Sequence, residues 1–354
     1  MQTYKKIVFL QHFSLIFCKM NRFILQFLFL FIVTLSCFGY TERPYVALQA
    51  DSIADDEKYG VITVSVADAR LGTDFDTEMG TQLLLGMPVK IVQQQGWWQV
   101  EGAEGYEAWI EPRAFVKMDK ETFNRWTNAK KVIFTYDYGF AYEKMDEHKQ
   151  RVSDLVFGDI LKWEGENGKF YQVSYPDGRK GYVLKTQAAL FDHWKSSRRL
   201  TEESIVQTAF TLKGIPYVWG GTSVKGMDCS GFTKTVFLKN GVILLRNASQ
   251  QAQAGIPVDI SKGYDNLRPG DLMFFGKKAT GDAGEKIRHV AIYIGNKEFI
   301  HASGYIRISS LDSAQPDYDP RNAREFVRAT RIIGAVGSEG IWKIDDNPLY
   351  QIQK

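Results

Sequence analysis

A glycine-rich loop that runs into a cysteine places the strongest constraint on this chain. Residues 220–232 read Gly-Gly-Thr-Ser-Val-Lys-Gly-Met-Asp-Cys-Ser-Gly-Phe, and the apolar residues from Phe232 onward have helical spacing. Asp228, or the loop before it, can cap that helix, which puts Cys229 in the first turn. Free N–H groups and the positive end of the helix dipole favour an anion there, so we expect a lowered thiol pKa and a nucleophilic thiolate. The same N–H groups can hold the oxyanion that forms when a thiolate attacks a carbonyl.

Two histidines can supply the base that such a nucleophile needs. His289 and His301 lie in alternating segments on either side of Gly295-Asn296-Lys297, a pattern typical of a tight hairpin. Alternation makes the two imidazoles cross-strand or diagonal neighbours on one sheet face. Either histidine alone would be an ordinary half-buried residue, and a lone cysteine an ordinary small apolar one. Together they match a thiolate, its base and an orienting group.

The N-terminus reads as an export signal over residues 1–39. Met20-Asn21-Arg22 precedes an apolar run that is too short for a comfortable membrane span. Three outcomes remain open: ordinary cleavage before Tyr40, lipid attachment at Cys37, or a retained anchor, with Met1 or Met20 as the start. We expect an exported protein of the periplasm or cell envelope, with membrane contact only if Cys37 is lipid-anchored.

Charge and cysteine usage narrow the partners. The formal net charge of +3 includes Lys5, Lys6, Lys19 and Arg22 of the signal, so the remainder is close to neutral and gives no sign of a nucleic-acid partner. Cys229 is the one cysteine left after cleavage, so no internal disulfide framework is expected.

An internal duplication predicts two similar small β-barrels. Two pairs of segments are similar in sequence at a nearly equal offset. They are Gly86-Met87-Pro88-Val89-Lys90 with Gly158-Asp159-Ile160-Leu161-Lys162, and Trp98-Gln99-Val100 with Tyr171-Gln172-Val173. In the first copy we expect strands at 61–66, 83–92, 97–100 and 106–110. The copies are linked through a short packed helix within 118–130.

A third, mixed region is expected after the duplicated barrels. Residues 191–200 are predicted to be a charged linker, Thr201 to cap a helix, and 276–288 to form an exposed loop. The predicted domains are a signal peptide at 1–39, a first barrel with its leader at 40–117, a second barrel at 118–190 and a catalytic domain at 191–354. The predicted fold class is α+β.

Five sequence blocks in order resemble the NlpC-type cell-wall cysteine peptidases, which have a papain-like fold. The resemblance covers roughly residues 200–335. The matching blocks are Tyr217-Val218-Trp219-Gly220-Gly221, Asp228-Cys229-Ser230-Gly231-Phe232, Arg268-Pro269-Gly270-Asp271-Leu272-Met273-Phe274-Phe275, His289-Val290-Ala291-Ile292-Tyr293-Ile294-Gly295 and Ile300-His301-Ala302. The duplicated barrels resemble bacterial SH3-like domains. The whole layout is similar to the γ-D-glutamyl-L-diamino acid endopeptidases, which trim freed peptidoglycan stem peptides.

The resemblance implies specific catalytic roles. Cys229 would attack the amide carbonyl, His289 would act as general base and then acid, and His301 would orient His289. The Cys229 N–H, with the Tyr217 hydroxyl, would bind the oxyanion.

The resemblance also implies a substrate-binding set. Glu78 and Tyr106 of the first barrel would select a free N-terminal L-Ala, and Trp219, Asp228 and Ser230 would line the cleft. One position departs from the family pattern: Asn247 stands where an aspartate often follows the arginine. The charge is lost there, and Ser249 is a candidate substitute.

Three functions therefore compete. The first is an exported endopeptidase acting on freed stem peptides. The second is a wall-binding protein with a silent peptidase domain, and the third is a hydrolase of cross-linked wall with relaxed recognition of the N-terminus. Peptidoglycan-derived peptides are the expected partners. No metal or other cofactor is expected, because a thiol peptidase needs none.

Overall fold

The computed structural model describes residues 58–281 and 283–351. The predicted signal peptide, Cys37 and almost all of the leader lie outside these residues. Within the described part, no helix is both long and apolar enough to cross a membrane.

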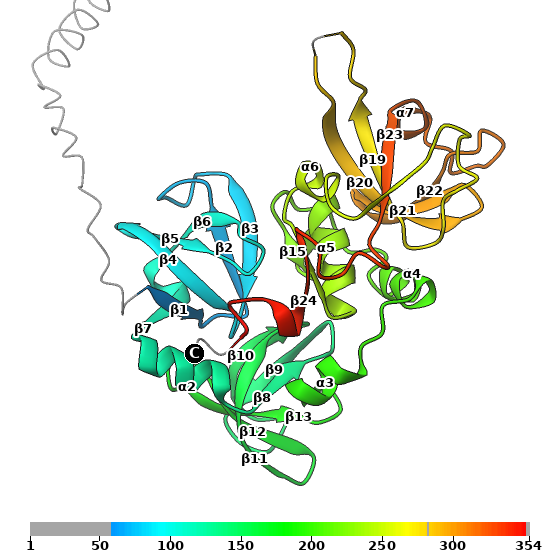
Figure 1. Ribbon diagram of the computed structural model, residues 1–354. Coiled ribbons are helices and arrows are strands. Elements are labelled where there is room, and N and C mark those ends of the chain that lie inside the picture. The colour runs from blue at the N-terminus through cyan, green and yellow to red at the C-terminus, as the bar shows by residue number, and fades with distance from the viewer. Residues whose placement is uncertain (1–57, 282, 352–354) are drawn as a thin grey trace, which may run out of the picture. The chain divides into compact units, whose positions relative to one another are not determined.

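The first sheet has seven antiparallel strands that curl around a small apolar core (Figure 1). The strands are β1 (Tyr59–Ile62), β2 (Val66–Arg70), β3 (Met79–Leu84), β4 (Pro88–Gln95), β5 (Trp97–Glu101), β6 (Glu107–Ile110) and β7 (Phe115–Met118). Their order across the sheet is β3-β2-β6-β5-β4-β1-β7, and the short 3-10 helix η2 (Pro112–Ala114) precedes β7.

The second sheet repeats the first strand for strand. It consists of β8 (Lys131–Phe134), β9 (Tyr138–Tyr142), β10 (Arg151–Val156), β11 (Ile160–Asn167), β12 (Phe170–Ser174), β13 (Lys180–Leu184) and β14 (Ala188–Leu190). Its order, β10-β9-β13-β12-β11-β8-β14, is the first order displaced by seven strands. The predicted duplication is therefore confirmed.

The two repeats meet at the turn that the sequence repeat marks. The Leu85 amide donates to Asp159 Oδ1 at 3.1 Å, and the Ile160 amide donates to the Leu85 carbonyl at 2.8 Å. The Leu85 side chain packs in the core of the second sheet. Gly86 has a φ of +78°, and a Cβ there would lie 1.9 Å from the Ile160 carbonyl oxygen, so the contact requires glycine.

Two strand predictions in the first repeat were wrong. The segment 83–92 is split between β3 and β4, because Gly86 turns the chain where the apolar pattern continues. The segment 61–66 holds the end of β1 and only the first residue of β2. A continuous run of apolar residues does not reveal a tight turn within it.

The predicted linker helix is confirmed, but the predicted charged linker is not a loop. Helix α2 (Lys120–Asn128) is capped by Asp119 and buries Phe123 and Trp126. Residues 191–197 form helix α3, which buries Phe191 and Trp194. These aromatic residues lie three apart, so they share one helix face beneath the charged residues between them.

The third region is a mixed α+β unit, as predicted. Its elements are α4 (Glu202–Thr211), β15 (Thr222–Ser223), β16 (Gly226–Met227), α5 (Cys229–Lys239), β17 (Val242–Leu244), α6 (Ala248–Gln251), β18 (Ile256–Val258), β19 (Leu272–Lys277), β20 (Lys286–Gly295), β21 (Glu298–Ser303), β22 (Tyr305–Ser310), α7 (Pro320–Arg324), β23 (Phe326–Arg331), β24 (Ile341–Lys343) and η3 (Ile344–Asp346). Thr201 caps α4 through a capping box. The predicted exposed loop is shorter than expected, since β19 and β20 extend into it.

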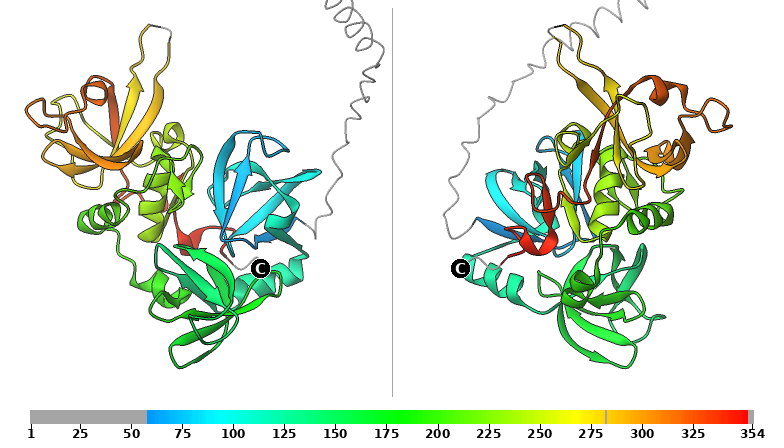
Figure 2. Two further views of the ribbon diagram at one scale, coloured as in Figure 1. Left: turned by 180° about the vertical axis from the view of Figure 1, so that it is seen from behind. Right: turned by 45° about the vertical axis from the view of Figure 1, so that its right-hand side comes forward.

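A six-stranded antiparallel sheet, in the order β18-β23-β19-β20-β21-β22, carries helix α5 on one face (Figure 2). Val290, Ile292 and Ile300 point to that helix. Ala291, Tyr293 and Phe299 point to a second core on the other face. The predicted hairpin is confirmed, and its turn residues Asn296 and Lys297 both have positive φ.

We expect Gly86→Ala to destabilise the protein more than Gly96→Ala. Both glycines have positive φ, so each alanine costs about 1–2 kcal/mol in backbone strain. At Gly96 nothing lies within 4 Å of the new Cβ, whereas at Gly86 it meets the Ile160 carbonyl. The clash should add about 1–3 kcal/mol, measured as the free energy of unfolding in denaturant. Equal losses in the two variants would contradict the tight contact between the repeats.

Candidate active site

The candidate nucleophile is held at the start of α5 by Asp228. Asp228 is the N-cap, and its Oδ1 accepts from the Gly231 amide at 2.7 Å. Its Oδ2 accepts from the Gly220 amide at 2.9 Å, so one carboxylate joins the glycine-rich loop to the helix. A Cβ on Gly231 would lie 2.0 Å from the Gly221 carbonyl oxygen. The loop can approach the helix only because residue 231 is glycine.

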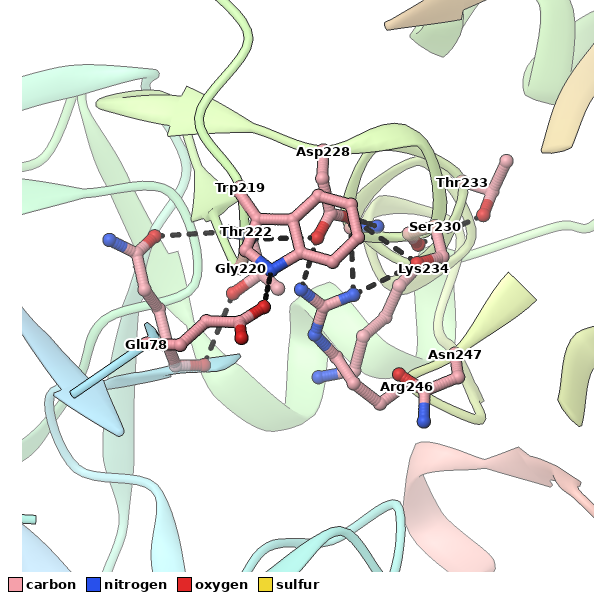
Figure 3. Close-up of polar contacts among 12 residues, drawn as sticks. Glu78, Trp219, Gly220, Thr222, Asp228, Ser230, Thr233, Lys234, Arg246 and Asn247 are labelled. Atoms are coloured by element: carbon pink, nitrogen blue, oxygen red, sulfur yellow. Dashed lines mark hydrogen bonds and ion pairs between the residues drawn. The ribbon is translucent and has the colours of Figure 1, made fainter. Parts of the chain in front are cut away.

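A buried arginine neutralises this carboxylate. Arg246 is 2% exposed, and its two terminal nitrogens bind both oxygens of Asp228. Arg246 Nη1 also donates to Ser230 Oγ at 2.9 Å. Figure 3 shows the guanidinium turned toward Asp228 and Ser230. The predicted cleft residues Asp228 and Ser230 are thus occupied by contacts within the protein.

The Cys229 thiol does not have the lowered pKa that the helix position predicts. Burial raises the pKa of Cys229 to about 11, and the negative charge of Asp228 adds to the effect. The amides of Val290 and Ser230 donate toward the sulfur and act in the opposite direction, as does the positive charge of Arg246. Cys229 is 7% exposed, so loss of hydration outweighs the N–H groups. The expectation of a preformed thiolate was wrong for this structure.

The two candidate histidines meet on the sheet face that they share with Ala291 and Phe299. His289 Nε2 lies 2.8 Å from His301 Nδ1, and His301 Nε2 lies 3.1 Å from Ser309 Oγ. The remaining ring nitrogen, His289 Nδ1, has no hydrogen-bond partner within the described residues and is the one free to act on a thiol. The described part of the chain has no hydrogen bond between the sulfur and His289. The sulfur instead lies against the amide of Val290, the next residue along β20.

Both imidazoles are held neutral by their surroundings. Burial lowers the pKa of His289 to about 3, and the neighbouring His301 adds to the effect. Burial and the charge of Arg307 likewise lower the pKa of His301. The rings of Phe275 and Phe299 pack against the pair at centroid distances of 5.9 and 4.8 Å and help to exclude water. The resting site is therefore a neutral thiol with neutral imidazoles.

The first barrel contacts the nucleophile loop and its flank through the side chains of Glu78, Gln82 and Ser65. Glu78 Oε1 accepts a hydrogen bond from Trp219 Nε1, and Figure 3 shows the two side chains pointing toward one another. Gln82 Oε1 accepts from the Thr222 amide at 3.0 Å and from the Ser223 hydroxyl at 3.0 Å. Glu78 forms no ion pair within the described residues.

The two candidate tyrosines have different charged neighbours. Burial raises the pKa of Tyr106, and the charges of Glu78, Asp228 and Glu104 add to the effect, so its hydroxyl lies near all three carboxylates. Burial also raises the pKa of Tyr217, with Cys229 as the next contribution, which places this hydroxyl near the sulfur. Glu78 thus lies near both Trp219 and Tyr106, while Tyr217 lies near Cys229.

Asn247 and Ser249 are not joined to the other candidates. Both are exposed around the start of α6, where Asn247 is the N-cap and forms a capping box with Gln250. The Asn247 backbone N–H donates to Gln250 Oε1 at 3.0 Å, which is a local helix-start contact. Their substrate-binding roles stay predictions.

Sequence reasoning missed several residues that hold the site. Arg246 was visible only as the residue before Asn247, and Ser309 was visible only through alternation along β22. Lys234 and Glu104 form a buried ion pair at 2.6 Å between α5 and the first barrel, which no local pattern signals. In residues 58–281 and 283–351, no three His, Cys, Asp or Glu side chains gather in a way that could hold a metal ion.

The sequence matches known proteins over this site and over the barrels. The profile described as "NlpC/P60 family" matches residues 214–324. A Bacillus subtilis protein named "Gamma-D-glutamyl-L-lysine dipeptidyl-peptidase" is 30% identical over 244 residues, covering 66% of this chain and 76% of that protein. The Bacillus cereus protein of the same name is 29% identical over 245 residues, covering 66% and 70%.

Two further similarities bear on fold and substrate. A crystal structure of an NlpC/P60 family protein from Bacillus cereus superimposes with a TM-score of 0.65 at 25% identity, covering 77% of this chain and 99% of that one. An Escherichia coli protein named "Murein DD-endopeptidase MepS/Murein LD-carboxypeptidase" is 45% identical over 124 residues, covering 34% of this chain and 57% of that protein.

Alkylation of Cys229 should report the raised thiol pKa. The thiolate is the reactive form, so we expect the iodoacetamide rate of the folded protein to rise about tenfold per pH unit from about pH 7 to 10. The same protein unfolded in urea is the control, and its rate should level off near the free-cysteine pKa of about 8.5. Mass spectrometry of the Cys229 peptide separates this site from Cys18 and Cys37. A folded-state rate that is flat above about pH 6 would instead indicate a preformed thiolate.

Proposed function

The chain belongs to the NlpC/P60 family of cysteine peptidases, and from this membership we propose that it hydrolyses the γ-D-Glu–diamino acid bond of peptidoglycan stem peptides that carry a free N-terminal L-Ala. The similarity to the two Bacillus peptidases extends beyond the 214–324 segment, which favours their kind of substrate. The silent-peptidase hypothesis loses its support because the cysteine and both histidines are present.

The proposed reaction begins with coupled proton transfer and attack. The Cys229 thiol gives its proton to His289 Nδ1 while the sulfur bonds to the carbonyl carbon of γ-D-Glu. The amides of Val290 and Ser230 stabilise the sulfur as its negative charge develops. The imidazolium of His289 keeps its Nε2 proton, and this N–H group donates a hydrogen bond to His301 Nδ1.

The tetrahedral intermediate then collapses. Its oxyanion is bound by the Cys229 N–H, which as a first-turn amide has no partner within the helix, with the Tyr217 hydroxyl beside it. The carbon–nitrogen bond breaks, and His289 gives the proton to the leaving amine. Water, activated by the neutral His289, hydrolyses the thioester and restores the thiol.

Free-amine recognition is proposed for Glu78. Three carboxylates lie near the Tyr106 hydroxyl: Glu78, Asp228 and Glu104. Asp228 is paired with Arg246 and Glu104 with Lys234, which leaves Glu78 to meet an ammonium group. The Trp219 bond that fixes Glu78 beside the nucleophile loop is the observation that carries the proposal.

A relaxed wall hydrolase is the second candidate. Asn247 lacks the charge that would help to hold the substrate amine, and the similarity to the E. coli murein endopeptidase is confined to about a third of this chain. The Glu78–Trp219 contact favours the first candidate, because a cross-linked wall offers few free N-terminal amines.

We further propose export to the cell envelope, where such peptides arise. The three-domain layout with boundaries at 117 and 190 belongs to the same proposal. The mass of the mature N-terminus distinguishes cleavage before Tyr40 from lipid attachment at Cys37.

Mass spectrometry of two peptides tests the proposed activity. We expect L-Ala-γ-D-Glu-diaminopimelate to be cut at the γ-D-Glu bond and its N-acetylated form to resist. Cys229→Ala should abolish cleavage, because no other described thiol can form the thioester. Cleavage of both peptides would favour the wall hydrolase, and full activity of Cys229→Ala would overturn the mechanism.

Glu78→Gln should reduce amine recognition without disturbing the fold. The introduced amide can still accept the Trp219 hydrogen bond but lacks the charge, so we expect kcat/KM for the free-amine peptide to fall about ten- to a hundredfold. The preference over the N-acetylated peptide should shrink in parallel. Glu107→Gln, at an exposed carboxylate on β6 of the same barrel, is the matched control and should behave as wild type. An unchanged preference in Glu78→Gln would locate amine recognition elsewhere.

A further inference from the structure

We propose that Ser309 is a positioning residue that completes the hydrogen-bonded series His289–His301–Ser309, by accepting a hydrogen bond from the His301 Nε2–H group when His289 becomes positively charged. This inference rests on the catalytic roles proposed for Cys229, His289 and His301. It adds Ser309 as a fourth group, which holds His301 in the required tautomer.

The geometry places Ser309 at the buried end of one continuous series of hydrogen bonds. His301 Nδ1 faces His289 Nε2 at 2.8 Å, and His301 Nε2 faces Ser309 Oγ at 3.1 Å. His301 is 0% exposed and Ser309 is 1% exposed, so water does not reach this end. Strand β22 pairs with β21 so that Ser309 lies opposite Phe299, on the sheet face that carries His301.

Proton counting makes the serine necessary. When His289 takes the thiol proton at Nδ1, both of its nitrogens carry protons, so Nε2–H must donate to His301 Nδ1. His301 Nδ1 is then an acceptor, and the His301 proton must sit on Nε2. That N–H is directed at Ser309 Oγ, which therefore accepts. No proton moves to Ser309, and no bond to it forms or breaks.

The opposite tautomer would block the base. If Ser309 were absent, a His301 proton on Nε2 would have no acceptor among the described residues and would favour moving to Nδ1. His301 Nδ1–H would then donate to His289 Nε2, and the His289 proton would face the thiol from Nδ1. In that arrangement His289 cannot accept the thiol proton. A carboxylate in place of Ser309 would hold the tautomer by charge, whereas the hydroxyl holds it as a neutral acceptor in a neutral site.

The nearby charges do not replace the serine. Arg307, directly opposite His301 across the strands, and Arg288 both act against a positive charge on His301. His301 therefore stays a neutral imidazole with one ring proton. Hydrogen bonds decide which of its two nitrogens carries that proton. Ser309 is the one side chain that bonds Nε2 within the described residues.

Ser309→Ala and Ser310→Ala form a matched pair for the test. Both serines are on β22 and almost fully buried, but Ser310 Oγ accepts from the Asp312 amide and lies on the other face. We expect Ser309→Ala to lower kcat about ten- to a hundredfold with KM within about twofold of wild type, because leaving a buried donor unsatisfied costs about 1–3 kcal/mol and 1.4 kcal/mol is tenfold. Ser310→Ala should keep wild-type kcat and KM, even if its melting temperature falls.

A tautomer measurement separates this inference from a structural effect. Nitrogen NMR of histidine-labelled protein should show His301 protonated at Nε2 in the wild type and in Ser310→Ala, and shifted toward Nδ1–H in Ser309→Ala. An unchanged kcat and tautomer in Ser309→Ala, with Cys229→Ala inactive, would overturn the serine alone. Full activity in Cys229→Ala would instead overturn the proposed function. Equal kcat losses in both serine variants would also overturn the inference, since burial alone would then explain them.

Discussion

The arrangement of the whole site depends on the carboxylate of Asp228. It caps α5, accepts a hydrogen bond from the Gly220 amide and receives both terminal nitrogens of Arg246, so one buried group fixes the loop, the helix and the segment between β17 and α6. Such a group is stable inside a protein only when its charge is paired and its oxygens are satisfied. Arg246 meets that requirement, and the cost is that neither residue is free to bind a ligand.

The same carboxylate raises the cost of making a thiolate beside it. The helix start offers N–H groups to the sulfur, yet burial and the charge of Asp228 prevail, and the resting thiol stays protonated. Burial likewise keeps both imidazoles neutral. In the proposed reaction, charge therefore separates only as the sulfur bonds to the substrate carbonyl, when the oxyanion and imidazolium form together. Because the thiolate is the form that oxidants attack, a protonated thiol is also the less readily oxidised form.

Local patterns in the sequence could predict the parts of the site whose geometry is local. The Asp228 cap, the hairpin that joins His289 to His301 and the repeat in the barrels all follow from spacing of a few residues or from self-similarity, and each is present. The pKa of Cys229 could not be predicted this way, since it depends on how much protein covers the sulfur. The ion pair of Lys234 with Glu104 joins segments distant in sequence, and only the packing of the barrel on α5 brings them together. The division of β3 from β4 was hidden because Gly86 interrupts a run that is apolar on both sides.

The pairing of buried charges explains how the first barrel can supply the proposed specificity for a free amine, although the nucleophile lies on α5 outside that barrel. Among the described residues, hydrogen bonds and ion pairs cross from that barrel to the α5 region through four residues: Glu78, Gln82, Glu104 and Ser65. Glu104 is paired with Lys234 in a buried site, so it serves as an anchor. Glu78 is exposed and accepts a hydrogen bond from a neutral indole, so its position is fixed by a partner that brings no positive charge of its own. Because Asn247 contributes no charge, the electrostatic energy of amine recognition in the proposed complex comes from the Glu78 carboxylate alone. Since the fold fixes the position of Glu78, it also sets the distance between the bound amine and Cys229.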